Sequence, residues 1–255
     1  MLRALGVIPA RYASTRFRGK PLAPLGNRTL LEEVWRKAGA ADRLARLIVA
    51  TDDQRIVDSC RGYGAEVWMT SEHHASGTDR AAEVLARCGE QGEHYDIVLN
   101  VQGDEPMISP ASLDGLLDPF RTDPDTEMAT LCEPLADEKE FLDPNVVKVV
   151  FDRDRRALYF SRAPIPHPRD GRIDLGACRK HQGIYAYRSD VLAELTARPA
   201  AELESIEGLE QLRALAAGYT IRVIESDFHS IGVDTPDDLQ RVAALLAGTT
   251  EDTPT

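Results

Sequence analysis

The alternation of short apolar runs with amphipathic stretches is the feature that most limits how this 255-residue chain can fold. In the first half, each apolar run is continuous rather than alternating, which is typical of strands covered on both faces of a parallel sheet. Strands are expected at 4–8, 47–50, 65–69 and 97–101, and helices at 30–41, 54–63 and 80–88 and from Pro110 onward. This strand–helix repetition predicts an open α/β sheet.

The rhythm changes in the second half, where apolar runs follow one another with fewer helical stretches between them. Strands are expected at 128–132, 146–151, 157–160 and 183–187, and closing helices at 209–217 and 236–246. Residues 163–180 contain three prolines and several charges, so they are expected to form a loop. We predict a mixed, mostly parallel sheet with a small inserted lobe, forming one domain over residues 1–247. A frayed tail is expected over 248–255.

Composition argues against several classes of protein. The net charge of −12 disfavours nucleic acid and anionic membranes as partners, and no apolar run approaches the roughly 20 residues of a membrane span. The four cysteines stand far apart without a Cys-x-x-Cys pair, which favours reduced thiols over a disulfide framework or a zinc site. A cytoplasmic protein is expected.

Basic residues gather at the start of the chain. The first 31 residues carry six Lys and Arg and no acidic residue, although the remainder is strongly acidic. Most of them lie in a loop that follows the first predicted strand and contains Arg11, Arg16, Gly19 and Lys20. The loop has neither the dinucleotide fingerprint nor the Walker pattern, because Pro21 follows the lysine. It is interpreted as a different triphosphate-binding loop at the carboxyl edge of the sheet, the alternative being a solvated charged loop.

Two acidic segments offer oxygen ligands for a divalent ion. The sequence Asn-Val-Gln-Gly-Asp-Glu-Pro, with Gln102 and Asp104, follows a predicted buried strand, although Gly-Asp and Glu-Pro are also ordinary turn formers. In Gly-Val-Asp-Thr-Pro, Thr235 and Pro236 suit a helix start, which leaves Asp234 unexplained. We hypothesise that Asp104 and Asp234 hold one Mg²⁺ together.

The other candidates are weaker on their own. The segment with Ser76, Gly77 and Arg80 precedes a predicted helix, so it suits either a helix cap or a loop that grips a base. Five later polar residues each have an ordinary structural interpretation as a surface charge, a strand end or an exposed helix position. They are Arg162, His181, Tyr185, Glu210 and Gln211.

Taken together and in order, these motifs resemble the 3-deoxy-manno-octulosonate cytidylyltransferases, or CMP-Kdo synthetases, over nearly the whole chain. The matching segments are 8–16, 19–22, 50–52, 76–80, 100–106, 145–150, 157–162, 209–213 and 232–236. The chain departs from the family pattern at Arg18, where a proline is usual, and at Gln182, where an apolar residue is more common. The cytidylyl chemistry is therefore better supported than the identity of the sugar.

The resemblance implies a nucleotide-diphospho-sugar transferase-like fold, helices on both faces of the sheet, a homodimer, Mg²⁺ as cofactor and CTP as nucleotide. It implies that CTP and 3-deoxy-manno-octulosonate (Kdo), an acidic eight-carbon sugar, yield CMP-Kdo and pyrophosphate for lipopolysaccharide-type glycans. Arg11, Lys20, Asp104 and Asp234 are the implied catalytic residues. The implied nucleotide ligands are Ala10, Arg11, Arg16, Lys20, Ser76, Gly77, Arg80, Gln102 and Asp104. The implied sugar ligands are Gln102, Arg162, His181, Tyr185, Glu210 and Gln211.

Other functions stay open at this point. The alternative is an enzyme of the same fold that acts on another acidic sugar, such as an 8-amino-octulosonate or sialic acid. A non-catalytic nucleotide-binding module would not need a second carboxylate beside Asp104. A glycosyltransferase would more often carry an Asp-x-Asp motif where this chain reads Gln102-Gly103-Asp104.

Overall fold

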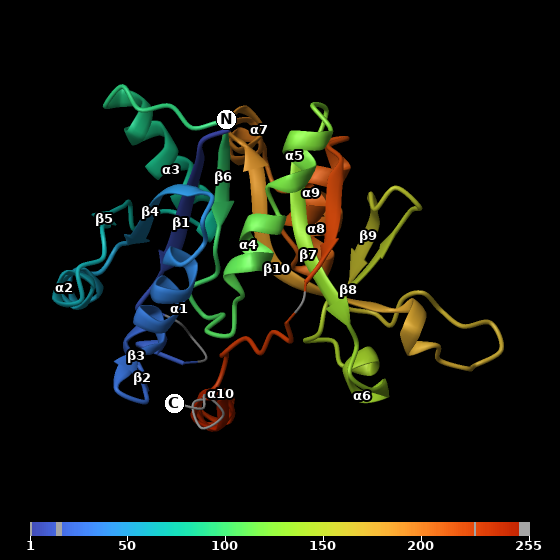
Figure 1. Cartoon of the computed structure of the whole chain (residues 1–255). Helices are drawn as coiled ribbons and strands as arrows, with labels where there is room; N and C mark the ends of the chain where they lie inside the picture. Colours follow the sequence, from blue (N-terminus) through green and yellow to red (C-terminus); the bar gives the residue numbers. More distant parts are fainter. Residues whose placement is uncertain (1, 14–16, 227, 250–255) are drawn as a thin grey trace. The chain divides into compact units, whose positions relative to one another are not determined.

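The computed structural model describes residues 2–13, 17–226 and 228–249. The chain divides into two compact units, one formed by residues 1–114 and 228–255 and the other by residues 115–227 (Figure 1). The second unit is thus inserted into the chain of the first. The expectation of one domain over 1–247 stays a prediction, and residues 250–255 of the expected tail lie outside the described residues.

The first unit is built on a parallel sheet. Its strands pair in the order β6-β1-β4-β5, side by side in Figure 1. Their bounds are β1 (Ala4–Ala10), β4 (Leu44–Thr51), β5 (Val67–Met69) and β6 (Ile97–Asn100). The apolar runs of β1, β6 and the end of β4 are almost fully buried, because both faces of the sheet are covered there. The edge strand β5 is only half-buried, and Met69 is 43% exposed.

Helices cover both faces of this sheet, as expected. Ile8 and Pro9 of β1 point to opposite faces, since side chains alternate along a strand. Ile8 lies beside Leu31 next to Gly103, whereas the ring of Pro9 packs against Gly77. Leu31 belongs to α1 (Leu30–Gly39) and Gly77 begins α3 (Gly77–Glu90), so these two helices flank the sheet. The helix α2 (Gln54–Gly62) packs against β4 and β5.

The remaining elements of the first unit lie in the connections. The hairpin of β2 and β3 leads into α1, where the Thr29 hydroxyl caps the helix by accepting from the Glu32 amide. The element bounds are η1 (Lys20–Leu22), β2 (Pro24–Leu25), β3 (Arg28–Thr29), α4 (Pro110–Gly115, which ends at the unit boundary) and α10 (Pro236–Thr249).

The second unit has a mixed sheet, which confirms the prediction that the strand–helix alternation of the first half does not continue. Its strands run in the order β11-β7-β10-β8-β9, with β11 and β7 parallel and the other pairs antiparallel. Their bounds are β7 (Met128–Pro134), β8 (Lys148–Phe151), β9 (Ala157–Ser161), β10 (Arg179–Arg188) and β11 (Ile221–Glu225). A register shift in β10 between Gln182 and Tyr185 marks a bulge in its pairing with β7.

Several elements of the second unit were not expected from the sequence, among them α7, α8 and β11. The helix expected at 209–217 is shorter, because α8 ends at Gly208 with φ of 63° and the chain must turn before α9 starts. The bounds are α5 (Asp118–Thr122), α6 (Glu138–Leu142), η2 (Leu175–Ala177), α7 (Ser189–Ala197), α8 (Glu202–Glu207) and α9 (Gln211–Ala216). Across both units, the described helices include none with the length and apolar character of a membrane span.

Candidate active site

Most of the predicted nucleotide and metal residues of the first unit line one cavity of about 420 Å³. The loops after β1 and β6 and the segment before α10 contribute to it. Because the carboxyl ends of parallel strands meet at one edge of a sheet, loops that are distant in sequence converge there. The lining residues are Pro9, Ala10, Arg11, Ala13, Lys20, Pro21, Gly77, Gln102, Gly103, Asp104 and Asp234.

Lys20 lies between the two predicted metal ligands. Its Nζ is 2.6 Å from Oδ2 of Asp104 and 3.4 Å from Oδ1 of Asp234. The Lys20 side chain is 12% exposed, compared with 33% for Asp104 and 46% for Asp234. Two carboxylates therefore converge on one ammonium group at the open edge of the sheet. That they hold one Mg²⁺ together stays a prediction.

The position of Lys20 depends on the glycine before it. Gly19 has φ of 77°, and a Cβ there would lie 3.2 Å from the ring of Tyr12. The Gly19 amide also donates to the Tyr12 carbonyl at 2.9 Å, which closes the loop. Only glycine meets both requirements without strain, so this residue brings the basic loop back toward the sheet. Arg16, a predicted triphosphate ligand, lies outside the described residues.

Arg11 and Gln102 reach the same cavity from neighbouring strands. Arg11 is exposed, and its Nη1 donates to the carbonyl of Ala75 at 3.2 Å. Gln102 is half-buried and follows β6 by two residues. A guanidinium group held near the rim is available for phosphate oxygens, which Arg binds with two parallel hydrogen bonds.

The segment with Ser76, Gly77 and Arg80 is both a helix cap and a neighbour of the cavity. Ser76 and Asp79 form a reciprocal capping box, which explains why α3 begins three residues earlier than expected. Gly77 lines the cavity, and a Cβ there would meet the ring of Pro9 at 3.1 Å. Thus Ser76 holds the helix start while Gly77 keeps the wall of the cavity close to β1.

Arg80 is fully buried rather than part of the cavity lining. Its guanidinium donates to Thr70 Oγ1 at 2.7 Å, to the Ser71 carbonyl at 3.1 Å and to the carboxylate of Asp52. Within the first unit it therefore ties the loop after β5 to the end of β4. Its predicted contact with the nucleotide stays a prediction.

The sequence reasoning did not single out every residue that shapes the cavity. A Cβ on Gly103 would lie 2.8 Å from the backbone oxygen of Pro9, so only glycine fits between the β6 loop and β1. The visible signal was a glycine directly after a buried strand. Asp52 was also missed as the partner of Arg80, although it stands at the end of β4.

Five of the six predicted sugar ligands belong to the second unit, the exception being Gln102 in the first. His181 and Tyr185 lie on β10, with ring centroids 5.5 Å apart. His181 Nε2 is 2.9 Å from the Thr130 hydroxyl, and burial lowers the pKa of His181 from 6.5 to about 3. Burial also raises the pKa of Tyr185 well above its usual value, with further contributions from Tyr187 and Glu210. Both side chains are therefore uncharged near neutral pH.

Arg162 directly follows β9 and binds the end of α8, where the chain turns toward α9. Its Nε donates to the Glu207 carbonyl at 2.7 Å and its Nη1 to the Pro144 carbonyl at 3.0 Å. The Glu207 carboxylate in turn accepts from the Arg162 amide at 3.0 Å and the Ser161 hydroxyl at 2.6 Å. This reciprocal arrangement fixes the turn that leads to Glu210 and Gln211.

Glu210 and Gln211 differ in environment although they are adjacent. Glu210 is exposed and precedes α9, whereas Gln211 is only 4% exposed. The Nε2 atom of Gln211 has no hydrogen-bond partner among the described residues. A buried amide donor without an acceptor costs free energy, and a polar ligand would satisfy it. In the second unit, His181, Tyr185 and Glu210 lie near one another. That the five predicted residues form one sugar site stays a prediction.

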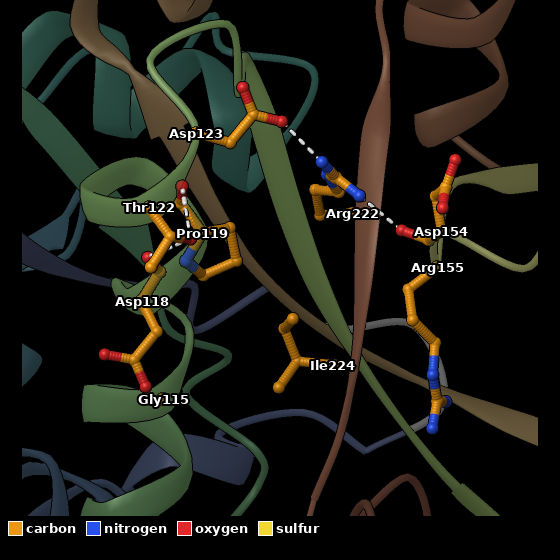
Figure 2. Close-up of a pocket in the computed structure, with 9 residues that line it drawn as sticks. All are labelled: Gly115, Asp118, Pro119, Thr122, Asp123, Asp154, Arg155, Arg222 and Ile224. Atoms are coloured by element: carbon orange, nitrogen blue, oxygen red, sulfur yellow. Dashed lines mark hydrogen bonds and ion pairs between the residues drawn. The ribbon is translucent and has the colours of Figure 1, made fainter.

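The second unit also has a hollow of about 400 Å³ that contains none of the predicted residues (Figure 2). Arg222, which crosses its rim, binds the Asp123 carboxylate and the Asp154 carbonyl. The Arg222 hydrogen bond is the main reason that the pKa of Asp123 lies below its usual value. Both arginines of the lining are already paired, Arg222 with Asp123 and Arg155 with Glu225, so the cavity of the first unit is the better candidate.

The described residues contain no group of three or more His, Cys, Asp and Glu side chains placed to hold a metal. The carboxylate pair of Asp104 and Asp234 is thus the available donor set in the cavity. Mg²⁺ is commonly bound in this way, through one or two carboxylates together with substrate phosphates and water.

Comparisons with known proteins show which family this chain resembles. The sequence profile of the family described as cytidylyltransferase matches residues 5–223. The chain is 51% identical over 249 residues to a 3-deoxy-manno-octulosonate cytidylyltransferase of Syntrophotalea carbinolica, covering 95% of this chain and 98% of the relative. It is 49% identical to the enzyme of that name from Solibacter usitatus, covering 96% and 94%.

Solved structures give the same result. A structure of CMP:2-keto-3-deoxy-manno-octonic acid synthetase complexed with CTP superposes with a TM-score of 0.89 at 42% identity, covering 97% of this chain and 99% of the other. A 4-diphosphocytidyl-2C-methyl-D-erythritol synthase from Anaerococcus prevotii, at 14% identity and a TM-score of 0.65, shares the fold.

Proposed function

Because this chain belongs to the 3-deoxy-manno-octulosonate cytidylyltransferase family, we propose that it transfers CMP from CTP to Kdo. The anomeric hydroxyl oxygen of the sugar forms a bond to the α-phosphorus of CTP, and the bond from that phosphorus to pyrophosphate breaks. The observation that carries the proposal is the convergence of Asp104, Asp234 and Lys20 in one cavity at the carboxyl edge of a parallel sheet.

Mg²⁺ fits this site as the proposed cofactor. Asp104 and Asp234 already face a single cation, the Lys20 ammonium, and both are hard oxygen donors of the kind that Mg²⁺ prefers. Two protein ligands leave coordination positions for phosphate oxygens and water. A bound Mg²⁺ would supply positive charge against the triphosphate and lower the pKa of a coordinated hydroxyl.

The side chains of the cavity then act by binding and charge neutralisation. Lys20 and Arg11 are placed to hold phosphate oxygens and to stabilise the charge that builds on the departing pyrophosphate. Nucleotidyl transfer needs reactants in line and charge compensation more than covalent help from the protein. Gly77 and Gly103 contribute by letting their segments pack closely against Pro9 of β1, which shapes the wall of the cavity.

The proposed sugar subsite uses uncharged groups for hydroxyls and one guanidinium for the carboxylate. Gln211 offers the buried donor without an acceptor, and His181 and Tyr185 stay neutral because they are buried. Arg162 is the proposed partner of the acid group. Gln182 is buried on β10 beside His181, so this departure from the family pattern could change which sugar is accepted. The panel of acceptor sugars below tests this.

We also propose that the enzyme is a cytoplasmic homodimer that supplies CMP-Kdo for lipopolysaccharide-type glycans. Among the described residues of the second unit, four large apolar side chains are exposed, namely Leu142 at 58%, Leu158 at 62%, Leu203 at 44% and Ile206 at 71%. Exposed apolar groups of this kind favour an interface with a second copy. All four cysteines are free and buried, which suits a reducing compartment. Light scattering of the purified protein measures the mass, and a monomer would contradict the dimer.

The reaction is tested by pyrophosphate release with CTP and Mg²⁺. The acceptors are Kdo, 8-amino-octulosonate and N-acetylneuraminate, with a reaction without sugar as control. We expect pyrophosphate to be released only when CTP is present, and fastest when Kdo is the acceptor. Release with N-acetylneuraminate alone would reject the proposed acceptor, and the absence of both release and CTP-dependent thermal protection would reject the proposed reaction.

A further inference from the structure

The two predicted metal ligands are far apart in sequence, and a backbone hydrogen bond joins their segments. The amide of Val233, directly before Asp234, donates to the carbonyl of Asp104 at 2.9 Å. Val233 is fully buried in a cluster with Leu25, Leu30 and Val242, so its side chain holds this segment against the unit. The main chains that carry both carboxylates thus run against each other.

Glu105 makes a second link between the same segments. Its carboxylate accepts a hydrogen bond from the hydroxyl of Ser230, which is only 3% exposed. A Cβ on Gly232 would lie 3.3 Å from Oε1 of Glu105, so this carboxylate occupies the space beside that glycine. The Glu105 side chain therefore faces residues 230–232, whereas Asp104, its neighbour, faces Lys20.

On the basis of the proposed function, we propose that Glu105 is a positioning residue for the metal pair. Its bond to Ser230 holds the segment before α10 so that Asp234 stays opposite Asp104. A hydrogen bond to a carboxylate is about twice as strong as one between neutral groups. Residues behind the direct ligands commonly fix ligand orientation, and their loss typically weakens metal binding by about 10- to 100-fold.

Adjacent acidic residues divide the work in this interpretation. Asp104 directs its carboxylate oxygen toward the cation, whereas the Glu105 carboxylate accepts a hydrogen bond from Ser230 in the segment before α10. This division accounts for a glycine at 232, because a side chain there would crowd the Glu105 carboxylate. In the alternative hypothesis, the Glu105 carboxylate itself coordinates the metal and does not act through Ser230.

The test compares Glu105→Ala, Glu105→Gln and Ser230→Ala with the unchanged enzyme. Mn²⁺ binding in the presence of CTP is followed by electron paramagnetic resonance, and the Mg²⁺ concentration for half-maximal pyrophosphate release is measured separately. Glu90→Ala is the matched control, because Glu90 is an exposed acidic residue at the end of α3. Thermal melting verifies that each variant is folded.

We expect Glu105→Ala to weaken Mn²⁺ binding and to raise the Mg²⁺ requirement by about tenfold or more. The Michaelis constant for CTP at saturating Mg²⁺ should change much less. Glu105→Gln should retain most of the affinity, since its amide oxygen still accepts from Ser230. Ser230→Ala should cost about fivefold, the usual effect of removing one hydrogen bond, and Glu90→Ala should change nothing.

Two results would overturn the proposal. Unchanged Mn²⁺ affinity in both Glu105→Ala and Ser230→Ala would show that the link does not position the pair. Equal losses in Glu105→Gln and Glu105→Ala would indicate direct coordination by the carboxylate. Failure of the proposed function gives a different result, which is seen in the unchanged enzyme. Either the unchanged enzyme would release no pyrophosphate from CTP, or its Mn²⁺ binding would be no stronger than that of Asp234→Asn.

Discussion

The cavity of the first unit and the β10 face of the second unit handle polar groups in opposite ways. In the cavity, Lys20 forms ion pairs with Asp104 and Asp234, and all three side chains are partly accessible to water. On β10, His181 is almost fully buried and kept neutral, with its ring between Phe160 and Tyr185. Water can stabilise charges that must later meet a triphosphate, whereas buried neutral groups recognise hydroxyls without a large desolvation cost.

The difference predicts where a substitution damages folding and where it damages activity. Charged cavity residues should affect turnover with little effect on stability. Buried polar residues should affect stability, pH dependence or sugar binding. The following predictions run from the largest expected effect to the smallest.

Arg80→Ala should be the most damaging change in the first unit. It removes a fully buried guanidinium that binds Asp52, Thr70 and Ser71, so we expect a loss of about 3 kcal/mol in the free energy of unfolding. Urea denaturation measures this loss. A variant of normal stability that had lost only CTP affinity would place Arg80 among the cavity ligands instead.

Asp104→Asn should lower turnover by about 100-fold or more while leaving stability nearly unchanged. The carboxylate is partly exposed and faces the Lys20 ammonium, so its loss removes charge from the site without opening the core. Steady-state kinetics with CTP and thermal melting measure the two effects. Near-normal turnover would contradict the metal assignment.

His181 should make the stability of the protein sensitive to acid. Its folded pKa of about 3 lies below the unfolded value of about 6.5, so below pH 6.5 the unfolded state binds a proton that the folded state does not. Stability should therefore fall between pH 6.5 and pH 3. At pH 5 the loss relative to pH 7 is about 2 kcal/mol from this residue.

The variant His181→Gln should lack this component when the unfolding free energy is measured from pH 7 to pH 5. His73→Gln serves as the control, because the His73 side chain is 88% exposed. Parallel pH profiles for the unchanged protein and His181→Gln would show that His181 titrates normally.

Gln211→Leu should have the smallest effect and should separate sugar binding from stability. The change removes a buried amide nitrogen that has no hydrogen-bond partner among the described residues, so stability should stay equal or rise slightly. The Michaelis constant for Kdo should rise about fivefold, with that for CTP unchanged. A clear loss of stability with normal sugar kinetics would assign Gln211 a purely structural role.

Local sequence determined much of the first unit. The continuous apolar runs identified β1, β4 and β6, because strands buried on both faces need apolar residues at every position. The segment 65–69 also predicted β5, which is only half-buried. Local sequence also led to the hypothesis that Asp234 is a metal ligand. Thr235 and Pro236 suited the start of α10, but the helix did not explain the aspartate before them. The order of the motifs was sufficient to identify the family.

Only the tertiary structure decided which distant residues meet. No local pattern states that Ser230 binds Glu105, that Arg80 binds Asp52, or that the Arg162 guanidinium is held by the Glu207 and Pro144 carbonyls. The short helices α7 and α8 were also missed, since helices of this length depend on packing more than on their own sequence. Residue type and spacing report local propensity, whereas burial and pairing arise from the closure of the chain, which brings Asp104 and Asp234 to one ammonium group.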